Sequence, residues 1–187
     1  MNNLRETFGD IDIYLFDQIL KGRIGPGMRV LDAGCGGGRN LVYLRGAGVE
    51  CFGVDQAAAM GDWEGFRVAN VEEMPFENGY FDVVLSSAVL HFAQDSRHFR
   101  AMVDEMWRVL RPGGLLFCRL ATTIGMPEVA EGWTVLPDGS ERFVVSAETL
   151  LGLTRELGGR LAEPLKSTVV HGERSMGTWV VWKGAAG

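Results

Sequence analysis

A glycine-rich segment directly after a short apolar run constrains this chain more than any other feature. Residues 30–40 read VLDAGCGGGRN, which predicts a buried strand, a tight turn and the start of a helix. Glycines at positions 34, 36 and 38 remove side chains where the backbone turns sharply and where a ligand approaches it closely. The first N–H groups of the following helix are available to an anionic group. Such a turn can also be only a tight connection, so the pattern needs support from elsewhere.

A second predicted strand ends in an acidic residue that provides this support. Residues 50–54 form an apolar, β-prone run that is followed by Asp55. Parallel strands open at the same carboxyl edge of a sheet, so we expect Asp55 beside the glycine turn, where it can accept hydrogen bonds from two ribose hydroxyls. The alternative is that Asp55 begins a loop or caps a helix. Its distance in sequence from the glycine turn favours the ribose role.

The spacing of the glycines argues against a dinucleotide. Counted from Gly34, the pattern G-x-G-x-x-G requires glycine at position 39, where this chain has Arg39. Asp32 stands at the end of the strand, where a carboxylate would repel a pyrophosphate and attract an ammonium group. A cofactor with an amino-acid end, a ribose and an adenine therefore fits better, and a nucleotide-dependent oxidoreductase is disfavoured.

Length and charge suit a single domain that acts on a small molecule. The chain has 187 residues, 47% of them hydrophobic, which is enough for one core and leaves no room for a second domain. The net charge of −6 and the lack of a Lys/Arg cluster disfavour nucleic acid as a partner. The first ten residues do not resemble a signal peptide, and no eighteen apolar residues run uninterrupted, so we expect a cytoplasmic protein without membrane contact.

The three cysteines are expected to be buried small hydrophobes. Cys35, Cys51 and Cys118 are widely spaced, and each lies in a predicted strand or in the glycine turn. This arrangement suggests neither a disulfide framework nor a zinc site.

Strand-like and helix-like segments alternate along the chain, which predicts a parallel sheet. Strands are expected at residues 29–33, 50–54, 66–70, 81–86, 115–120, 167–171 and 177–183. Helices are expected at residues 11–20, 40–46, 96–110 and 146–157.

Five segments follow one another in a characteristic order: VLDAGCGGG at 30–38, GVD at 53–55, VANVEEMPF at 68–76, YFDVVLSSAVLHF at 80–92 and WRVLRPGGLL at 107–116. Together they resemble the class I S-adenosylmethionine-dependent methyltransferases, in particular the small bacterial type 11 kind. The resemblance implies a Rossmann-like, doubly wound α/β fold. Its sheet would be mostly parallel and seven-stranded, with the last strand antiparallel and helices on both faces. It also implies S-adenosyl-L-methionine as the cofactor and transfer of its methyl group to a small-molecule acceptor.

The resemblance further implies ten cofactor-binding residues, grouped by the part of the cofactor that they face: Asp32, Gly34, Cys35 and Gly36 at the methionine end, Asp55 and Gln56 at the ribose, Asn70 and Val71 at the adenine, and Ser86 and Ser87 at the sulfonium. His91 is the candidate base for an acceptor that must lose a proton. The alternative for His91 is a packed structural histidine, and His98 is expected on a helix surface.

One methyltransferase domain is expected over residues 1–187. Residues 1–28 would form an N-terminal helical cap, and residues 122–142 would form a substrate loop. Met126 and Trp133 in that loop are candidates for lining an apolar acceptor pocket; the alternative is that the loop only packs back onto the domain.

Two features depart from the family pattern. The segment between Asp55 and the third strand is too short for a full crossover helix, which takes about a dozen residues. Either that helix is reduced to a turn or two, or the sequence lacks residues of the natural protein. Asn70 stands where family members commonly have Asp, although its carbonyl oxygen can still accept a hydrogen bond. These departures keep a second hypothesis open, in which the protein binds the cofactor without catalysis and acts through a partner.

Overall fold

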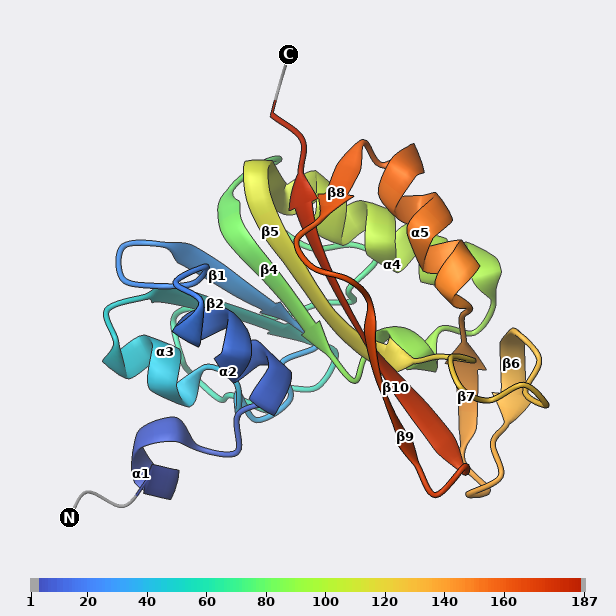
Figure 1. Ribbon diagram of the computed structural model, residues 1–187. Helices are drawn as coiled ribbons and strands as arrows, with labels where there is room; N and C mark the ends of the chain where they lie inside the picture. Colours follow the sequence, from blue (N-terminus) through green and yellow to red (C-terminus); the bar gives the residue numbers. More distant parts are fainter. Residues whose placement is uncertain (1–3, 186–187) are drawn as a thin grey trace.

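A mostly parallel sheet forms the centre of the structure, a computed structural model that describes residues 4–185 (Figure 1). The first three and last two residues of the expected domain lie outside the described residues. The sheet follows the path β3 (Phe66–Val68), β2 (Glu50–Asp55), β1 (Arg29–Ala33), β4 (Phe81–Ser87), β5 (Leu110–Ala121), β10 (Arg174–Lys183) and β8 (Gly159–Leu161). The first five strands of this path are mutually parallel, and β10 is antiparallel to both of its neighbours.

The expected sheet is confirmed in its class and differs in detail. A further strand, β9 (Lys166–Val170), pairs with the part of β10 that extends beyond β8. The sequence does not predict the three-residue strand β8, and with it the sheet has eight strands among the described residues rather than seven. The antiparallel hairpin of β9 and β10 extends past the carboxyl ends of the parallel strands (Figure 1).

Helices cover both faces of the sheet (Figure 1). On one face lie α2 (Ile13–Leu20) and α3 (Val42–Gly46), with α1 (Leu4–Phe8) in contact with α3. On the other face lie α4 (Ser96–Val109) and α5 (Ala147–Glu156). This arrangement confirms helices on both faces of a doubly wound fold.

Alternating apolar residues of β5 explain why helices must pack on both faces of the sheet. Leu115 and Phe117 belong to the hydrophobic cluster under α2 and α3, whereas Leu116 and Cys118 belong to the cluster under α4 and α5. All four side chains are fully buried. Successive side chains of a strand point to opposite faces, so an apolar run of this kind stabilises the fold only between two helical layers.

Side chains of capping residues accept hydrogen bonds at the starts of the helices. The Asp95 carboxylate accepts the His98 N–H at 2.7 Å at the start of α4, and the Ser146 hydroxyl accepts the Thr149 N–H at 3.1 Å at the start of α5. In α2, Asp12 is the N-cap, so the helix begins two residues later than expected. In α3, residues 38–41 form a tight turn first, which likewise delays its start by two residues.

The short crossover after β2 contains turns and no helix over residues 56–65. Of the two alternatives that the sequence left open, a helix reduced to a turn or two is therefore wrong. The Trp63 ring packs against β2 where a crossover helix would lie. It is so close to the backbone that a Cβ at Gly53 would lie 3.2 Å from the ring. Arg45 of α3 lies 4.7 Å from the Trp63 ring centroid. A single indole thus covers the part of the sheet that a crossover helix would otherwise bury.

Residues 122–142, expected as a loop, contain part of a second, two-stranded sheet. The strands β6 (Gly132–Val135) and β7 (Glu141–Val144) form an antiparallel hairpin beside the hairpin of β9 and β10 (Figure 1). Its turn is closed by the Leu136 N–H, which donates to the Ser140 carbonyl at 2.8 Å. These two hairpins and the carboxyl ends of the parallel strands surround the candidate site.

Candidate functional site

The glycine turn and Asp55 meet where β1 and β2 end. The two strands run in register, with Ala33 opposite Val54, so the residues that follow them emerge together. The Gly36 N–H donates to Asp55 Oδ2 at 2.9 Å, and the Ala57 N–H donates to Asp55 Oδ1 at 3.0 Å. These bonds fix the carboxylate at the edge of the glycine turn, where the sequence places it.

Gly34 is required by both its backbone and its surroundings. Its φ of +82° lies in the left-handed region, which strains a residue with a side chain. A Cβ at this position would lie 2.4 Å from Val89 Cγ2, too close for any real contact. The bare backbone therefore lets Val89, which follows β4, approach the end of β1.

A cavity of about 490 Å³ opens at this edge of the sheet, within the size range of small-molecule sites. Six of the ten expected cofactor-binding residues line it: Gly34, Gly36, Asp55, Gln56, Asn70 and Val71. The other lining residues come from the segments after β3 and β4 and from α4: Glu72, Ala88, Val89, Phe92, Gln94, His98 and Met102. His98, expected on a helix surface, lines this cavity with its Nε2 atom 3.4 Å from a Glu72 oxygen.

The other four expected residues are buried and do not line the cavity. Burial, the larger cause, raises the pKa of the Cys35 thiol to about 12, and the nearby carboxylates of Asp32 and Asp55 raise it further. Cys35 is therefore an uncharged packing residue, and Cys51 and Cys118 are buried as expected. The Ser86 hydroxyl has no hydrogen-bond partner among the described residues.

Asp32 is a buried carboxyl group that forms no ion pair with any residue that the structure describes. Only 1% of the residue is exposed, and Asn40 donates to its Oδ2 atom over a long 3.5 Å. Its Oδ1 atom has no hydrogen-bond partner in the described part of the chain. Burial raises the pKa of Asp32 to about 7. A free, buried carboxylate oxygen behind the glycine turn is suited to an ammonium group.

A polar network ties the start of α2 to the ends of β4 and β5. The Asp12 N–H donates to Asn40 Oδ1 at 3.0 Å, and the Asp12 carboxylate accepts from the Ser87 hydroxyl at 3.0 Å. Ser87 in turn accepts from Arg39 at 3.0 Å, and Arg119 Nε lies 3.5 Å from Asp12 Oδ2. Ser87, expected at the sulfonium, is thus engaged by α2 and by the helix side of the glycine turn.

A second cavity, of about 450 Å³, lies beside the first. Ala88 and Phe92 line both cavities. The remaining lining residues come mostly from the end of β5 and from the two hairpins: His91, Arg119, Ala121, Leu136, Asp138, Ser140, Arg142, Thr168, Val170, Arg174, Ser175 and Met176. The first cavity therefore adjoins a second one that is closed by the segment expected to hold the substrate.

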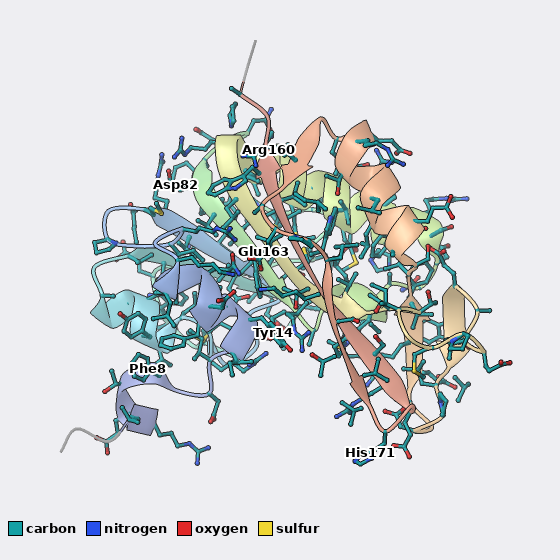
Figure 2. All side chains as sticks on the ribbon, viewed as in Figure 1. Phe8, Tyr14, Asp82, Arg160, Glu163 and His171 are labelled. Carbon is teal, nitrogen blue, oxygen red and sulfur yellow. The ribbon has the colours of Figure 1, made fainter. Side chains whose placement is uncertain are left out.

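The N-terminal helix reaches this second cavity as well. Tyr14 of α2 points toward the hairpin of β9 and β10, and its hydroxyl hydrogen-bonds the hydroxyl of Thr168, which lines the cavity (Figure 2). The Arg119 guanidinium lies 4.3 Å from the Tyr14 ring centroid. Helix α2 thus braces one wall of this cavity.

The lining of the second cavity differs from the expected apolar one. Met126 is buried and Trp133 is half exposed, and neither lines the cavity. In their place stand three arginines, Arg119, Arg142 and Arg174. They come from β5, β7 and β10 and are far apart in the sequence, so no local cluster of basic residues predicts that they meet. From the sequence, Arg119 is expected within the strand at residues 115–120 and Arg142 at the end of the loop at residues 122–142, and neither is assigned to the site.

His91 also lines the second cavity, from the short 3-10 helix η1 (Leu90–Phe92). The residue is 6% exposed, and its Nδ1 atom has no hydrogen-bond partner within residues 4–185. Burial, together with the nearby charge of Arg142, lowers the pKa of His91 to about 4. At neutral pH the imidazole is uncharged, so it can accept a hydrogen bond, but it is a weak base.

Two further properties concern the described part of the chain as a whole. None of its helices is both long and apolar enough to cross a membrane. It also contains no group of three or more His, Cys, Asp or Glu side chains placed to hold a metal ion.

Comparison with known proteins identifies this arrangement. Residues 31–118, from β1 into β5, match the family model of the methyltransferase domain. A malonyl-[acyl-carrier protein] O-methyltransferase from Enterobacter lignolyticus is 30% identical over 143 residues, which cover 72% of this chain and 55% of the relative. An uncharacterized methyltransferase from Synechocystis is 33% identical over 99 residues, covering 49% of this chain and 46% of the relative. The chain spans about half the length of the curated relatives that it matches.

Solved structures share the fold across almost the whole chain. The 1,6-didemethyltoxoflavin-N1-methyltransferase of Burkholderia thailandensis, solved with bound S-adenosylhomocysteine, has a TM-score of 0.72 at 18% identity and covers 97% of this chain and 81% of its own. The [4+2]-cyclase SpnF has a TM-score of 0.69 at 17% identity and covers 91% of this chain and 80% of its own. At these identities the likeness concerns the fold alone. The family model assigns residues 31–118 to the methyltransferase domain family, and the solved structures show that the rest of the chain completes the same fold.

Proposed function

We propose that this protein transfers the methyl group of S-adenosyl-L-methionine to a small-molecule acceptor. The observation that carries the proposal is the pair of adjoining cavities that share Ala88 and Phe92. The first would hold the cofactor and the second the acceptor, so that the methyl group would cross at the shared wall. The names of two proteins similar to this chain, an O-methyltransferase and an N1-methyltransferase, support this reaction class.

In this proposal the first cavity binds the cofactor by its three chemical parts. Asp55 would accept the ribose hydroxyls through the lone pairs that the Gly36 and Ala57 N–H groups leave free. Asn70 and Val71 would lie at the adenine. Asp32, with its unpartnered buried oxygen, would face the ammonium group of the methionine end. Gly34, Gly36 and Cys35 would form the turn around that end, and Gln56 would lie next to the ribose.

The bound cofactor would supply an electrophilic methyl group on a sulfonium, and the chain would supply the positioning. Holding two reactants in line can contribute on the order of 7 to 11 kcal/mol. Ser86 and Ser87 end the strand that leads into the shared wall at Ala88. His91 would contact the acceptor, and its low pKa suits an acceptor that has no proton to lose.

The domain limits belong to the same proposal. Residues 1–28 would act as a helical cap, because α2 is tied to Ser87 and Thr168, which lie near or in the two cavities. Residues 122–142 would serve as the substrate segment through Leu136, Asp138, Ser140 and Arg142. A cytoplasmic location and the absence of nucleic-acid partners stay predictions from the sequence.

Calorimetry followed by turnover assays tests the proposal. We expect saturable binding of S-adenosylmethionine and S-adenosylhomocysteine at one site, followed by transfer of labelled methyl to members of a small-molecule library. Binding without turnover on any acceptor, with a partner captured in stable complex, would favour the alternative of a non-catalytic binding protein. The missing crossover helix motivates that alternative, but the cavity next to Gln56 persists without the helix.

A further inference from the structure

Positive charge gathers in the second cavity although the chain as a whole is acidic. The sequence has 18 basic residues against 24 acidic ones, yet this cavity is lined by three arginines and one aspartate. His91, the other titratable lining group, is uncharged at neutral pH because its pKa is about 4. The wall therefore carries an excess of cationic groups, which attracts an anion.

The three arginines differ in how close a carboxylate lies to each guanidinium. Arg174 Nη1 lies 3.8 Å from an oxygen of Asp138, the one acid in the lining. Arg119 Nε lies 3.5 Å from Asp12 Oδ2, outside the lining. Arg142 has no carboxylate of the described residues within ion-pair distance, although, after the hydrogen bonds from Ser140, its charge helps to lower the pKa of Asp138. Its guanidinium donates to the backbone carbonyl of Glu141 at 2.6 Å.

Arg142 also lies at the place that matters for the reaction. Its guanidinium carbon is 5.0 Å from the centroid of the Phe92 ring, and Phe92 lines both cavities. The proximity of its charge is one cause of the low pKa of His91. The half-buried guanidinium thus stands at the shared wall, and no carboxylate among residues 4–185 lies within ion-pair distance of it.

We propose that the methyl acceptor is a small carboxylic acid, whose carboxylate pairs with Arg142 at the shared wall and is itself methylated. A planar guanidinium matches a carboxylate in geometry and charge, and it is the side chain that binds this group most specifically. The inference rests on the proposed function, because it names the substrate class of the same site.

The chemistry of a carboxylate agrees with the lack of a strong base in the lining. One carboxylate oxygen forms the new O–CH₃ bond, and the S–CH₃ bond breaks with its electron pair on the sulfur of the cofactor. No proton is removed, so a side chain that accepts protons at neutral pH is not needed. The positive sulfonium and the negative carboxylate become a neutral thioether and a neutral methyl ester, so the charges of both reactants are lost together in the step. His91 would then accept or donate one hydrogen bond and take no part in proton transfer.

The test compares acids with their amides on the chain loaded with S-adenosylhomocysteine. The probes are acetate, hexanoate, benzoate and phenylacetate, each with its primary amide, and binding is measured by NMR titration and calorimetry. We expect at least one acid to bind at least tenfold more tightly than its amide. If no acid binds more tightly than its amide, the proposal is wrong.

A second arm follows the methyl group from radiolabelled S-adenosylmethionine with the acid that binds best. The product should release its label as volatile methanol on base treatment, as methyl esters do, and the matched amide should give none. Label that enters the amide equally, or that stays base-stable, overturns the proposal.

Variants distinguish a specific role of Arg142 in acid binding from an effect of the net charge of the chain. Arg142→Gln should lower kcat/KM and acid affinity at least tenfold, and Arg142→Lys, which keeps the charge but not the fork, should lower them less. Arg160→Gln removes the same charge from β8, at the end of the sheet opposite the tip of the β9–β10 hairpin near His171 (Figure 2), and should change neither. Equal acid binding by wild type and Arg142→Gln would contradict the proposal.

The affinity for S-adenosylhomocysteine tells the two failures apart. It should be the same in wild type, Arg142→Gln and Arg160→Gln. If the wild-type chain does not bind this ligand at all, the proposed function fails. If it binds the ligand but shows no preference for acids, only the acceptor class fails.

Discussion

Replacing Asp32 by Asn should have opposite effects on stability and on cofactor affinity. Asp32 is 1% exposed, and among residues 4–185 its carboxyl group accepts only the long hydrogen bond from Asn40. In the free protein an ionised carboxylate at this place is costly, whereas Asn is neutral and nearly the same size. We therefore expect Asp32→Asn to be the more stable protein at pH 8 and the weaker binder of S-adenosylhomocysteine.

The magnitude follows from the pKa of Asp32, which burial raises from 3.8 to about 7. A shift of about three pKa units corresponds to about 4 kcal/mol of linked free energy, as an upper bound. Because the folded-state pKa is raised, the carboxyl group contributes most stability below pH 4, where it is protonated in both states. That contribution is lost as the pH rises from about 4 to 7. Over this window the stability of the variant relative to wild type should increase by about 1.4 kcal/mol per pH unit and then level off.

Urea unfolding of both proteins between pH 5 and 8.5 measures this difference, and calorimetry adds an independent readout. At pH 6 an ammonium group that pairs with Asp32 must displace its proton, so binding of S-adenosylhomocysteine should release up to about one proton in wild type and fewer in the variant. Proton release is obtained by repeating the titration in buffers of different ionisation enthalpy. A stability difference that does not change with pH would refute the raised pKa. Equal affinity and equal proton release in both proteins would refute the pairing of Asp32 with the ammonium group.

Three further substitutions test other parts of the site. Asp55→Ala should weaken binding of S-adenosylmethionine by about 1.5 to 3 kcal/mol, because the ribose hydroxyls lose a charged acceptor; calorimetry on the folded variant measures this, and an unchanged Kd would remove Asp55 from the ribose. Gly34→Ala should lower the urea midpoint of unfolding and abolish binding of S-adenosylhomocysteine, because the φ of Gly34 is +82° and the added Cβ would clash with Val89. Adding Val89→Ala should restore part of the stability. A Gly34→Ala variant as stable as wild type would contradict this reasoning. His91→Gln should change kcat less than tenfold, with a flat pH profile of kcat between pH 6 and 8 in wild type, because its pKa is about 4; a loss of a hundredfold or more would make His91 the base.

The fold was predictable wherever local pattern and burial agree. The strand over residues 29–33 is found with its expected limits, and the apolar run of β5 alternates between two hydrophobic clusters as a buried parallel strand should. The hydrogen bond between Gly36 and Asp55 was also foreseeable, because neighbouring parallel strands end at one edge. The sequence carries these features in consecutive residues.

Features that depend on contacts between distant segments could not be predicted in the same way. The strand β8 has three residues and pairs only through β10, so no periodicity announces it. Trp63 replaces a helix by packing on Gly53, which is a matter of tertiary shape. Arg119 and Arg142 meet at one cavity although 23 positions separate them in the sequence numbering, so the sequence pattern suggested an apolar lining around Met126 and Trp133 instead.

The most direct measurement is calorimetric titration of the 187-residue chain with S-adenosylhomocysteine, with Asp55→Ala as the control. We predict saturable one-site binding in the micromolar range for wild type and at least tenfold weaker binding for the variant. Absence of binding to folded wild-type protein would contradict the assignment of the cavity at Asp55 to the cofactor, and with it the proposed methyl transfer.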